Sequence, residues 1–202
     1  DHAIKDRFIA IPGKEQIEFD TVTYPQPPPG APPGWRFPNG TVLVKTFSLE
    51  MEVGNPKTAR RLETRILHHE RMPGEENQYG AQVWRGYTYI WNEEQTDATL
   101  LDSGGLNREF TVRDPEAPGG VRKQTWRFPS RAECTLCHTM ASKYVLGVNT
   151  LQMNKNHDYG DVIANQLDTL NHLDIFTKPL PKPVSELPRL INYHDQTQDL
   201  GR

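Results

Sequence analysis

A change of pattern near Ser130 constrains the fold of this chain more than any other feature of its sequence. Before Ser130, short β-branched and aromatic runs are separated by turn residues, and after it a helical pattern begins. Many short strands with turn signals between them predict an antiparallel sheet or barrel. We therefore expect an α+β fold in a single domain of 202 residues, with a β-rich part over residues 1–126 and a helical part over residues 130–176.

The β-rich part contains seven runs with strand character. The run over residues 60–70 alternates, which places Leu62, Thr64, Ile66 and His68 on one face. The aromatic run over residues 82–91 is expected to pack Trp84, Tyr87, Tyr89 and Trp91 on a sheet face. The runs are "DRFIAIP", "QIEF", "NGTVLVKTFSLEM", "RRLETRILHHE", "QVWRGYTYIW", "REFTV" and "VRKQTW".

Helical signals follow. Ser130 and Glu133 form a capping-box signature, so we expect a helix to begin at Arg131. Residues 161–176 predict a second helix with one apolar face. That face would carry Val162, Ile163, Gln166, Leu167, Leu170 and Leu173. Two Pro-rich segments, residues 24–38 and the tail 177–202, are expected to be a loop and an extended surface segment.

The only two cysteines of the chain lie in the predicted first helix, in the sequence Cys134-x-x-Cys137-His138. Positions i, i+3 and i+4 project from one side of a helix. C-x-x-C-H is the attachment motif of c-type haem, in which each thiol adds to a vinyl group and the histidine ligates the iron. A thioredoxin-like pair would need a βαβ context, and a zinc site needs about four ligands. We therefore favour haem over these readings and over structural cysteines.

The sixth ligand of the haem iron decides between two functions. A strong sixth ligand favours electron transfer, whereas an open position favours the binding of a small ligand. Met140 follows His138 too closely to cross to the other side of a haem, whereas Met153 lies 15 residues further on. Met153 is our first choice for the sixth ligand, although it could equally fill a core gap. The other candidates are His157, then His68; Met72 lies in a polar loop.

Composition excludes some classes of function. The net charge is −3, so no basic face indicates nucleic-acid binding. No apolar run approaches the roughly 18 residues that a membrane span requires. The first residues are charged and are not a signal peptide, so we expect either that an export signal has been removed or that this is an excised piece of a longer protein.

Five stretches, in order along the chain, resemble a family of predicted multi-domain c-type cytochromes. They are "DHAIKDRFIAIPG", "FPNGTVLVKTF", "RRLETRIL", "WRGYTYIWNEEQTDATLL" and "WRFPSRAECTLCHT". The resemblance covers roughly residues 1–176. It implies covalent haem c on Cys134 and Cys137, fusion to redox or carbohydrate-oxidising modules, and a second attachment motif downstream. This chain ends at Arg202 without that motif, which favours an excised domain with one haem.

A second likeness concerns the fold. "FPNGTVLVKTF", aromatic strands and a late C-x-x-C-H are similar to the β-sheet cytochromes c′ (the c′-β type) and their lysine-cross-linked relatives. This likeness implies that the sheet forms a wall of the haem site and that the distal side is open. It also gives interest to Lys45, which is otherwise an ordinary strand lysine. About 60 residues after His138 have no counterpart in those proteins.

These features predict a c-type cytochrome domain that relays electrons to or from a partner redox protein, or a fused dehydrogenase or cytochrome module. We expect an electron-transfer domain more than a catalyst. The alternative is a five-coordinate haem that binds or converts NO, CO, hydroxylamine or peroxide. Haem is attached to this motif outside the cytoplasm, so the resemblance implies an exported, periplasmic or cell-envelope protein.

Overall fold

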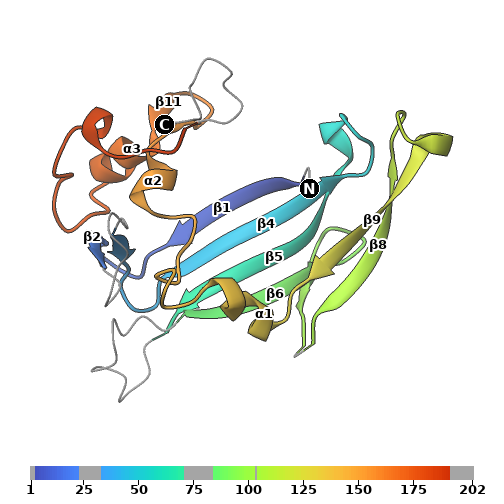
Figure 1. Cartoon of the computed structure of the whole chain (residues 1–202), viewed down its shortest axis with the longest axis horizontal. Coiled ribbons are helices and arrows are strands. Elements are labelled where there is room, and N and C mark those ends of the chain that lie inside the picture. Colours follow the sequence, from blue (N-terminus) through green and yellow to red (C-terminus); the bar gives the residue numbers. More distant parts are fainter. Residues whose placement is uncertain (1–2, 23–32, 71–83, 103, 192–202) are drawn as a thin grey trace. The chain divides into compact units, whose positions relative to one another are not determined.

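A computed structural model describes residues 3–22, 33–70, 84–102 and 104–191 of the chain (Figure 1). The chain forms two compact units. The first, Asp1–Pro12 with Asn39–Thr139, is called the sheet unit here. The second, Gly13–Pro38 with Met140–Arg202, is called the aromatic unit. The described residues are mostly antiparallel β-structure with few and short helices, which confirms the prediction of a β-rich chain.

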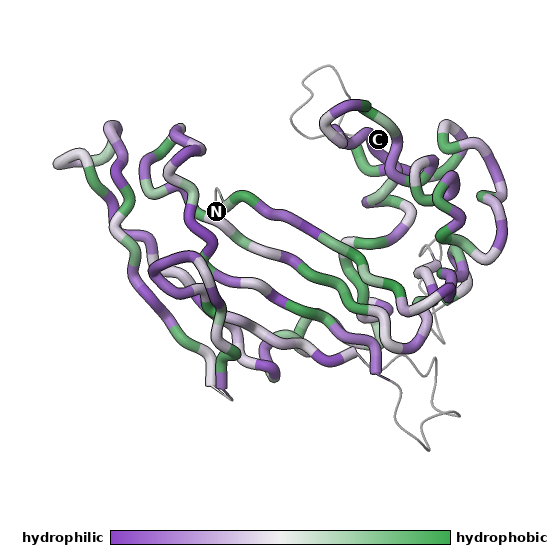
Figure 2. The backbone as a smooth tube through the Cα atoms, turned by 180° about the vertical axis from the view of Figure 1, so that it is seen from behind, coloured by the Kyte–Doolittle hydropathy of each residue, from purple (hydrophilic) through white to green (hydrophobic). Residues whose placement is uncertain are grey.

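The sheet unit is built on a five-stranded antiparallel sheet in the order β1-β4-β5-β6-β7 (Figure 1). These strands follow the β-branched and aromatic runs of the sequence, and Figure 2 shows polar and apolar stretches following one another along them. Their bounds are Ile4–Ala10 (β1), Val42–Glu50 (β4), Ala59–His69 (β5), Trp84–Trp91 (β6) and Ala98–Leu100 (β7).

A hairpin of β8 (Leu106–Arg113) and β9 (Val121–Phe128) covers one face of this sheet. Two short 3₁₀ turns, Pro56–Thr58 and Pro118–Gly120, precede β5 and β9. The ring of Phe47 packs edge-on against Trp126, with 5.9 Å between their centroids. The sheet face that packs on the hairpin is called the core face. Its buried cluster consists of Ala3, Phe47, Leu49, Leu62, Val112, Trp126 and Phe128.

A β-bulge changes which residues of β5 face the core. Opposite Phe47 and Ser48, the register of β5 shifts, and the consecutive residues Leu62 and Glu63 are both buried. A bulge places an extra residue in one strand and so interrupts strict alternation. Leu62 therefore lies on the core face, whereas Ile66 lies on the opposite face. The prediction that they share a face is wrong for this reason.

The aromatic residues of β6 also divide between the two faces. Trp84 is buried on the core face, where its ring stacks on His69 with centroids 4.9 Å apart. Tyr87, Tyr89 and Trp91 lie on the opposite face by alternation and are half-buried. The sequence therefore predicted the strand, but the aromatic residues do not share one face.

The aromatic unit has little regular structure. Its β2 (Glu18–Val22) pairs with β3 (Gly34–Arg36), and β10 (Asn156–Asp158) pairs with β11 (Ile163–Asn165). Short helices α2 (Thr150–Met153) and α3 (Gln166–His172) and a 3₁₀ turn, Val184–Glu186, complete it. No described helix is long and apolar enough to cross a membrane.

Aromatic rings form the core of this unit. Phe19, Phe37 and Phe176 surround Trp35 or contact one another, with ring centroids 5.2 to 6.4 Å apart. Tilted and edge-to-face ring pairs stabilise a core beyond the area that they bury. Ile17 is fully buried and forms a bridge with Phe176, which ties the start of this unit to residues far along the chain.

Buried hydrogen bonds fasten α2 inside the aromatic unit. The indole Nε1 of Trp35 donates to Thr150 Oγ1 (3.0 Å), and that hydroxyl donates to Asp20 Oδ1 (2.7 Å). Burial raises the pKa of Asp20, while the Thr150 and Trp35 donors lower it. Asn154, directly after α2, donates from Nδ2 to the backbone carbonyls of Val184 (2.9 Å) and Leu187 (3.0 Å).

The helical part differs from its prediction. Residues 161–176 form a strand and then α3, because Asn165 Oδ1 accepts from the Leu167 N–H and caps the helix there. Ile163 pairs in the β10–β11 hairpin and is 67% exposed, so the predicted apolar face does not exist. Of the Pro-rich segments, residues 24–32 and 192–202 lie outside the described part of the chain.

Candidate haem-attachment site

The helix that carries the cysteines, α1 (Arg131–Cys137), begins at the predicted residue. The Ser130 hydroxyl accepts from the Glu133 N–H (3.3 Å), and Glu133 Oε2 accepts from the Ser130 N–H (2.7 Å). This reciprocal pair is the predicted capping box. A helix of seven residues is marginal by itself, so its ends need such partners.

Glu133 also ties α1 to the β8–β9 hairpin. Arg127 of β9 donates from Nε and Nη2 to the two oxygens of Glu133, at 3.1 and 2.9 Å. These bonds, and then the Ser130 N–H, lower the pKa of Glu133 to about 2. The carboxylate therefore stays charged in all but strongly acidic solution, and the start of α1 is held against β9.

The C-x-x-C-H residues lie within one turn at the end of this helix. Cys134 is half-buried and Cys137 is exposed, and both are thiols. His138 is the C-cap residue, and its backbone N–H donates to the Cys134 carbonyl (3.0 Å). The i, i+3, i+4 spacing places the three side chains on one side of α1, as the sequence predicts.

A glycine in β6 lets Cys134 approach the sheet. A Cβ atom on Gly86 would lie 2.6 Å from Cys134 Cβ and 2.8 Å from Cys134 Sγ, closer than atoms pack in proteins. Only glycine therefore leaves room for this cysteine. An isolated glycine inside an aromatic strand is a sequence signal for such a close approach, and it would have identified Gly86.

The environment of the Cys134 thiol keeps it protonated. Burial raises the pKa of Cys134 most, and Glu63 raises it further. Arg65 and the neighbouring Thr88 hydroxyl oppose this effect. If a haem were bound here, the protonated thiol would supply both the sulfur and the hydrogen for addition across one of its vinyl groups.

Beside Cys134, the core face of the sheet presents an apolar row. The register pairs Ile9 with Leu43, Leu43 with Leu67, and Leu67 with Gly86, so the row crosses four strands and ends at the glycine under Cys134. Its three side chains are half-buried rather than packed in the buried cluster. We call Ile9, Leu43 and Leu67 the apolar row.

The next row on the same face is charged. Arg7 pairs with Lys45, Lys45 with Arg65, and Arg65 with Thr88, which lies beside Cys134. We call Arg7, Lys45 and Arg65 the cation row. The sequence points to Lys45 only, because the row exists only when three strands are paired.

One carboxylate lies next to the cation row. Glu63 is fully buried, and its Oε1 is 2.5 Å from Arg65 Nη2. Burial raises the pKa of Glu63, while Arg65 lowers it. Lys45 Nζ and the Arg65 guanidinium both lie over the Phe47 ring, 4.7 and 4.6 Å from its centroid. Cation–π contacts of this kind tolerate a cation without neutralising it.

Met153 lies in the aromatic unit, as the last residue of α2, whereas Cys134, Cys137 and His138 lie in the sheet unit. Asn149 caps α2 by accepting from the Gln152 N–H (3.1 Å). The structure thus brings the three motif residues together and places Met153 in a separate unit, where its side chain is half-buried.

The candidate histidines have different surroundings. His157 is exposed in β10, with its ring against Tyr159. His68 lies on the face of the sheet that points away from Cys134. Its neighbour His69 lies on the core face, the face that Cys134 contacts, and is buried. Because of the bulge in β5, His69 rather than His68 faces the core. Met72 lies outside the described residues.

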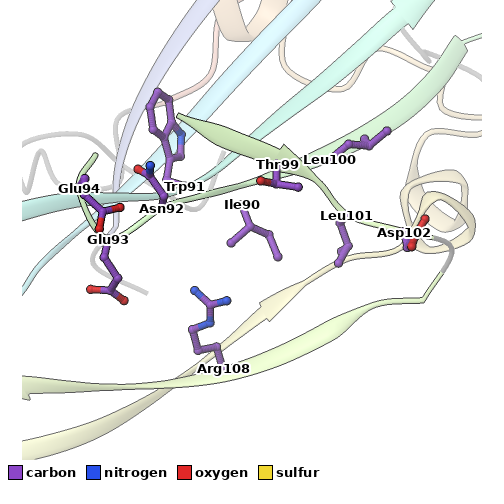
Figure 3. A pocket seen from close by; sticks show the side chains of 10 residues that line it. All are labelled: Ile90, Trp91, Asn92, Glu93, Glu94, Thr99, Leu100, Leu101, Asp102 and Arg108. Carbon is purple, nitrogen blue, oxygen red and sulfur yellow. The ribbon is translucent and has the colours of Figure 1, made fainter. Parts of the chain in front are cut away.

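One pocket of the described residues lies at the β6–β7 turn and not at the cysteines. Its volume is about 560 Å³, and acidic and apolar side chains around the β6–β7 turn line it together with Arg108 (Figure 3). It includes neither the motif residues nor the apolar or cation row. The chemistry of the motif, rather than pocket size, therefore identifies the candidate site.

Comparison with models of known protein families, with curated proteins and with solved structures found no match to this chain. Among the described residues, no group of three or more His, Cys, Asp or Glu side chains is placed to hold a metal ion. The porphyrin ring supplies the equatorial ligands of haem iron, so this finding concerns ions held by side chains alone.

Proposed function

We propose that this chain is a c-type cytochrome domain with one covalent haem that relays electrons to or from a partner redox module. The observation that carries the proposal is the C-x-x-C-H motif on a capped helix, with Cys134 seated against Gly86. Cys134 and Cys137 would form the thioethers, and His138 would supply an axial nitrogen to the iron. The bound haem would supply a one-electron redox centre.

The residues around the motif fit such a group. The two thiols lie one helical turn apart on the same side as His138. The apolar row offers a half-buried hydrophobic surface next to Cys134, as a flat macrocycle requires, and burial in such surroundings excludes water from the metal. The proposed likeness to cytochromes c′ of the β type requires a β-rich fold, which this chain has.

For the sixth ligand we propose Met153. Residues 139–152 can reach across a porphyrin, since an extended chain covers about 3.3–3.6 Å per residue. Thioether ligation opposite histidine raises the reduction potential, as suits a carrier that accepts electrons from a dehydrogenase. The Asn149 cap and the buried Asn154 would hold this segment in place.

One observation favours a second candidate function. Met153 belongs to a different compact unit from the motif residues, so the unit that carries the motif supplies one axial ligand, His138. With no second ligand the iron would keep an open position and bind a small ligand such as NO or CO. This five-coordinate haem is the alternative to electron relay.

Both proposals place the protein outside the cytoplasm. Covalent attachment at C-x-x-C-H takes place where c-type cytochromes mature, so we propose an exported, periplasmic or cell-envelope protein. The partner would be a redox protein or a fused dehydrogenase or cytochrome module. Cell fractionation tests this proposal, and holoprotein made and retained in the cytosol would contradict it.

The decisive experiment is the mass of denatured protein exported by cells that mature c-type cytochromes. We expect a mass one haem above that of the polypeptide, and loss of that haem in the double variant Cys134→Ser/Cys137→Ser. Thr135→Ser, inside the same motif, is the matched control and should keep the haem. A wild-type mass equal to the bare polypeptide would refute the proposal and favour a thiol pair.

Optical spectra of the same holoprotein distinguish the two functions. Methionine ligation predicts the weak absorption band of ferric haem at the edge of the near infrared, and its loss in Met153→Ala with a lower midpoint potential. Rapid CO binding by reduced wild-type protein, without that band, would favour the ligand-binding function.

A further inference from the structure

The cation row is an unusual arrangement for a sheet. Arg7, Lys45 and Arg65 stand directly opposite one another on three paired strands, and like charges in such positions destabilise a sheet. Opposite charges would be expected at these cross-strand positions if the row served the sheet alone. The arrangement therefore needs another explanation.

Within the described part of the chain, these cations are not balanced. Glu63 is the one carboxylate that pairs with the row, through Arg65. No described carboxylate lies within ion-pair distance of Lys45 Nζ. Burial, and then Arg7, Arg65 and Lys5, lower the pKa of Lys45 to about 8. A surplus of positive charge thus lies on this face, with Lys45 and Arg65 half-buried and Arg7 exposed.

This surplus lies on the same face as the candidate attachment site. The row continues from Arg65 to Thr88, which lies beside Cys134. Strands are about 4.8 Å apart, so Lys45 of β4 stands roughly 10 Å from Thr88 of β6. The apolar row runs parallel to it, so an apolar and a cationic surface adjoin next to the cysteine.

We propose that Arg7, Lys45 and Arg65 bind the carboxylates of the haem that Cys134 and Cys137 hold. The inference rests on the proposed function and goes beyond it by naming the residues that bind the acidic edge of the cofactor. A porphyrin carries its propionates on the edge away from the vinyl groups, and the row extends away from Cys134.

The donors of the row suit such carboxylates. Arginine binds carboxylates through two parallel N–H groups, and charge-assisted bonds of this kind are the strong ones. The Nε of Arg65 is buried and has no hydrogen-bond partner among the residues described, so it retains donor capacity. Lys45 would act as a compact point charge over Phe47.

A free oxyanion such as phosphate could meet the same cations, and the experiment separates the two sources. Holoprotein of the wild type is compared with Lys45→Gln and Arg7→Gln. The matched controls are Lys57→Gln and Arg113→Gln, exposed cations of the same unit. Resonance Raman reports the propionate bending modes, and redox titration reports the midpoint potential.

If the cations bind the propionates, Lys45→Gln and Arg7→Gln should shift the bending modes towards those of solvated carboxylates. They should also lower the midpoint potential, because a positive charge near the haem favours the reduced state. The controls should change neither quantity. Because Lys45 is half-buried, Arg7→Gln keeps the test valid if Lys45→Gln holoprotein does not accumulate, and Lys45→Arg should restore wild-type behaviour.

Two outcomes would overturn the inference while leaving the proposed function intact. One is attached haem whose propionate modes do not change in Lys45→Gln or Arg7→Gln. The other is that inorganic phosphate shifts the potential of the wild type but not of Lys45→Gln, with unchanged propionate modes, which would assign the row to a free anion. Wild-type protein without haem would refute the proposed function itself, and this inference with it.

Discussion

The sheet unit and the aromatic unit use buried polar groups differently. In the aromatic unit, hydrogen bonds run from Trp35 to Thr150 and from Thr150 to Asp20. In the sheet unit, Glu63 Oε2 and Arg65 Nε are buried without a hydrogen-bond partner among the described residues. Buried polar groups are normally paired, so the first set stabilises the fold, whereas the unpaired atoms of the second lie in or next to the cation row. In the aromatic unit, Gln166 Nε2 is the described side-chain atom that is likewise buried without a partner.

The comparison also separates the expected effects of substitutions. Changes to the aromatic core should lower the free energy of unfolding without affecting the attachment of the proposed haem. Changes beside Cys134 should affect haem attachment more than their cost in stability suggests. Four substitutions test this separation, in order of expected size.

Trp35→Ala should have the largest effect on stability. Trp35 is 2% exposed, contacts three phenylalanine rings and donates to Thr150. Removing a buried tryptophan typically costs about 3–5 kcal/mol. Urea unfolding should show this loss, whereas the mass of the protein should still include haem. Phe8→Ala, at a residue 63% exposed, is the control and should change stability little. Loss of haem in Trp35→Ala would contradict the conclusion that the aromatic core affects stability alone.

Gly86→Ala should have a smaller effect on stability and a larger effect on haem. The added methyl would overlap Cys134, and overpacking of this kind costs about 1–3 kcal/mol. Because Cys134 would have to move from its position, we expect much of the exported protein to lack haem. The control is Gly104→Ala in the same unit, where an added Cβ meets no atom within 4 Å. Equal haem content in the two variants would contradict the role assigned to Gly86.

Ser130→Ala removes one half of the capping box of α1. Loss of a serine cap costs about 1 kcal/mol. Ser130→Asn should restore most of the stability, since asparagine also caps helices. Chemical denaturation measures the cost, and mass spectrometry should show less complete haem attachment. A cap that mattered for the fold alone would leave attachment unchanged.

The smallest expected effect is a pH dependence from Glu133. The pKa of Glu133 is lowered from 4.5 to about 2 by Arg127 and Ser130, so the charged form is favoured in the folded state. Its contribution to stability is complete above pH 4.5 and is lost as the pH falls towards 2. Acid titration of unfolding should therefore be less steep in this window for Glu133→Gln than for the wild type. Glu116→Gln, on the exposed turn before β9, should not alter the slope.

Local signals in the sequence were enough to locate α1 and most strands. Ser130 and Glu133 are three residues apart, so their capping box forms within one turn and needs no tertiary contact. The runs that became β4, β5, β6, β8 and β9 have the side-chain types that suit a pleated surface. The sequence likewise predicted that the side chains of Cys134, Cys137 and His138 lie together, because helical spacing alone places them on one side of α1.

Features that depend on strand pairing could not be read from the sequence. The bulge at Leu62 and Glu63 exists only relative to β4, and because of it Ile66 and His68 do not share the face of Leu62 as predicted. The hairpin of β10 and β11 replaced the start of a predicted helix, because pairing with β10 holds Ile163 in a strand. Register is a property of two strands, so neither sequence run determines it alone.

The sequence by itself thus determined the C-x-x-C-H motif, the helix that presents it and the β-rich character of the chain, since each arises from contacts within a few residues. Only the tertiary structure placed Gly86 under Cys134 and aligned Arg7, Lys45 and Arg65 across three strands. Arg7 and Cys134, the most distant of these residues in the sequence, are 127 positions apart. Gly86 and the three cations lie on the same face because hydrogen-bonded strands fix which side chains stand opposite one another.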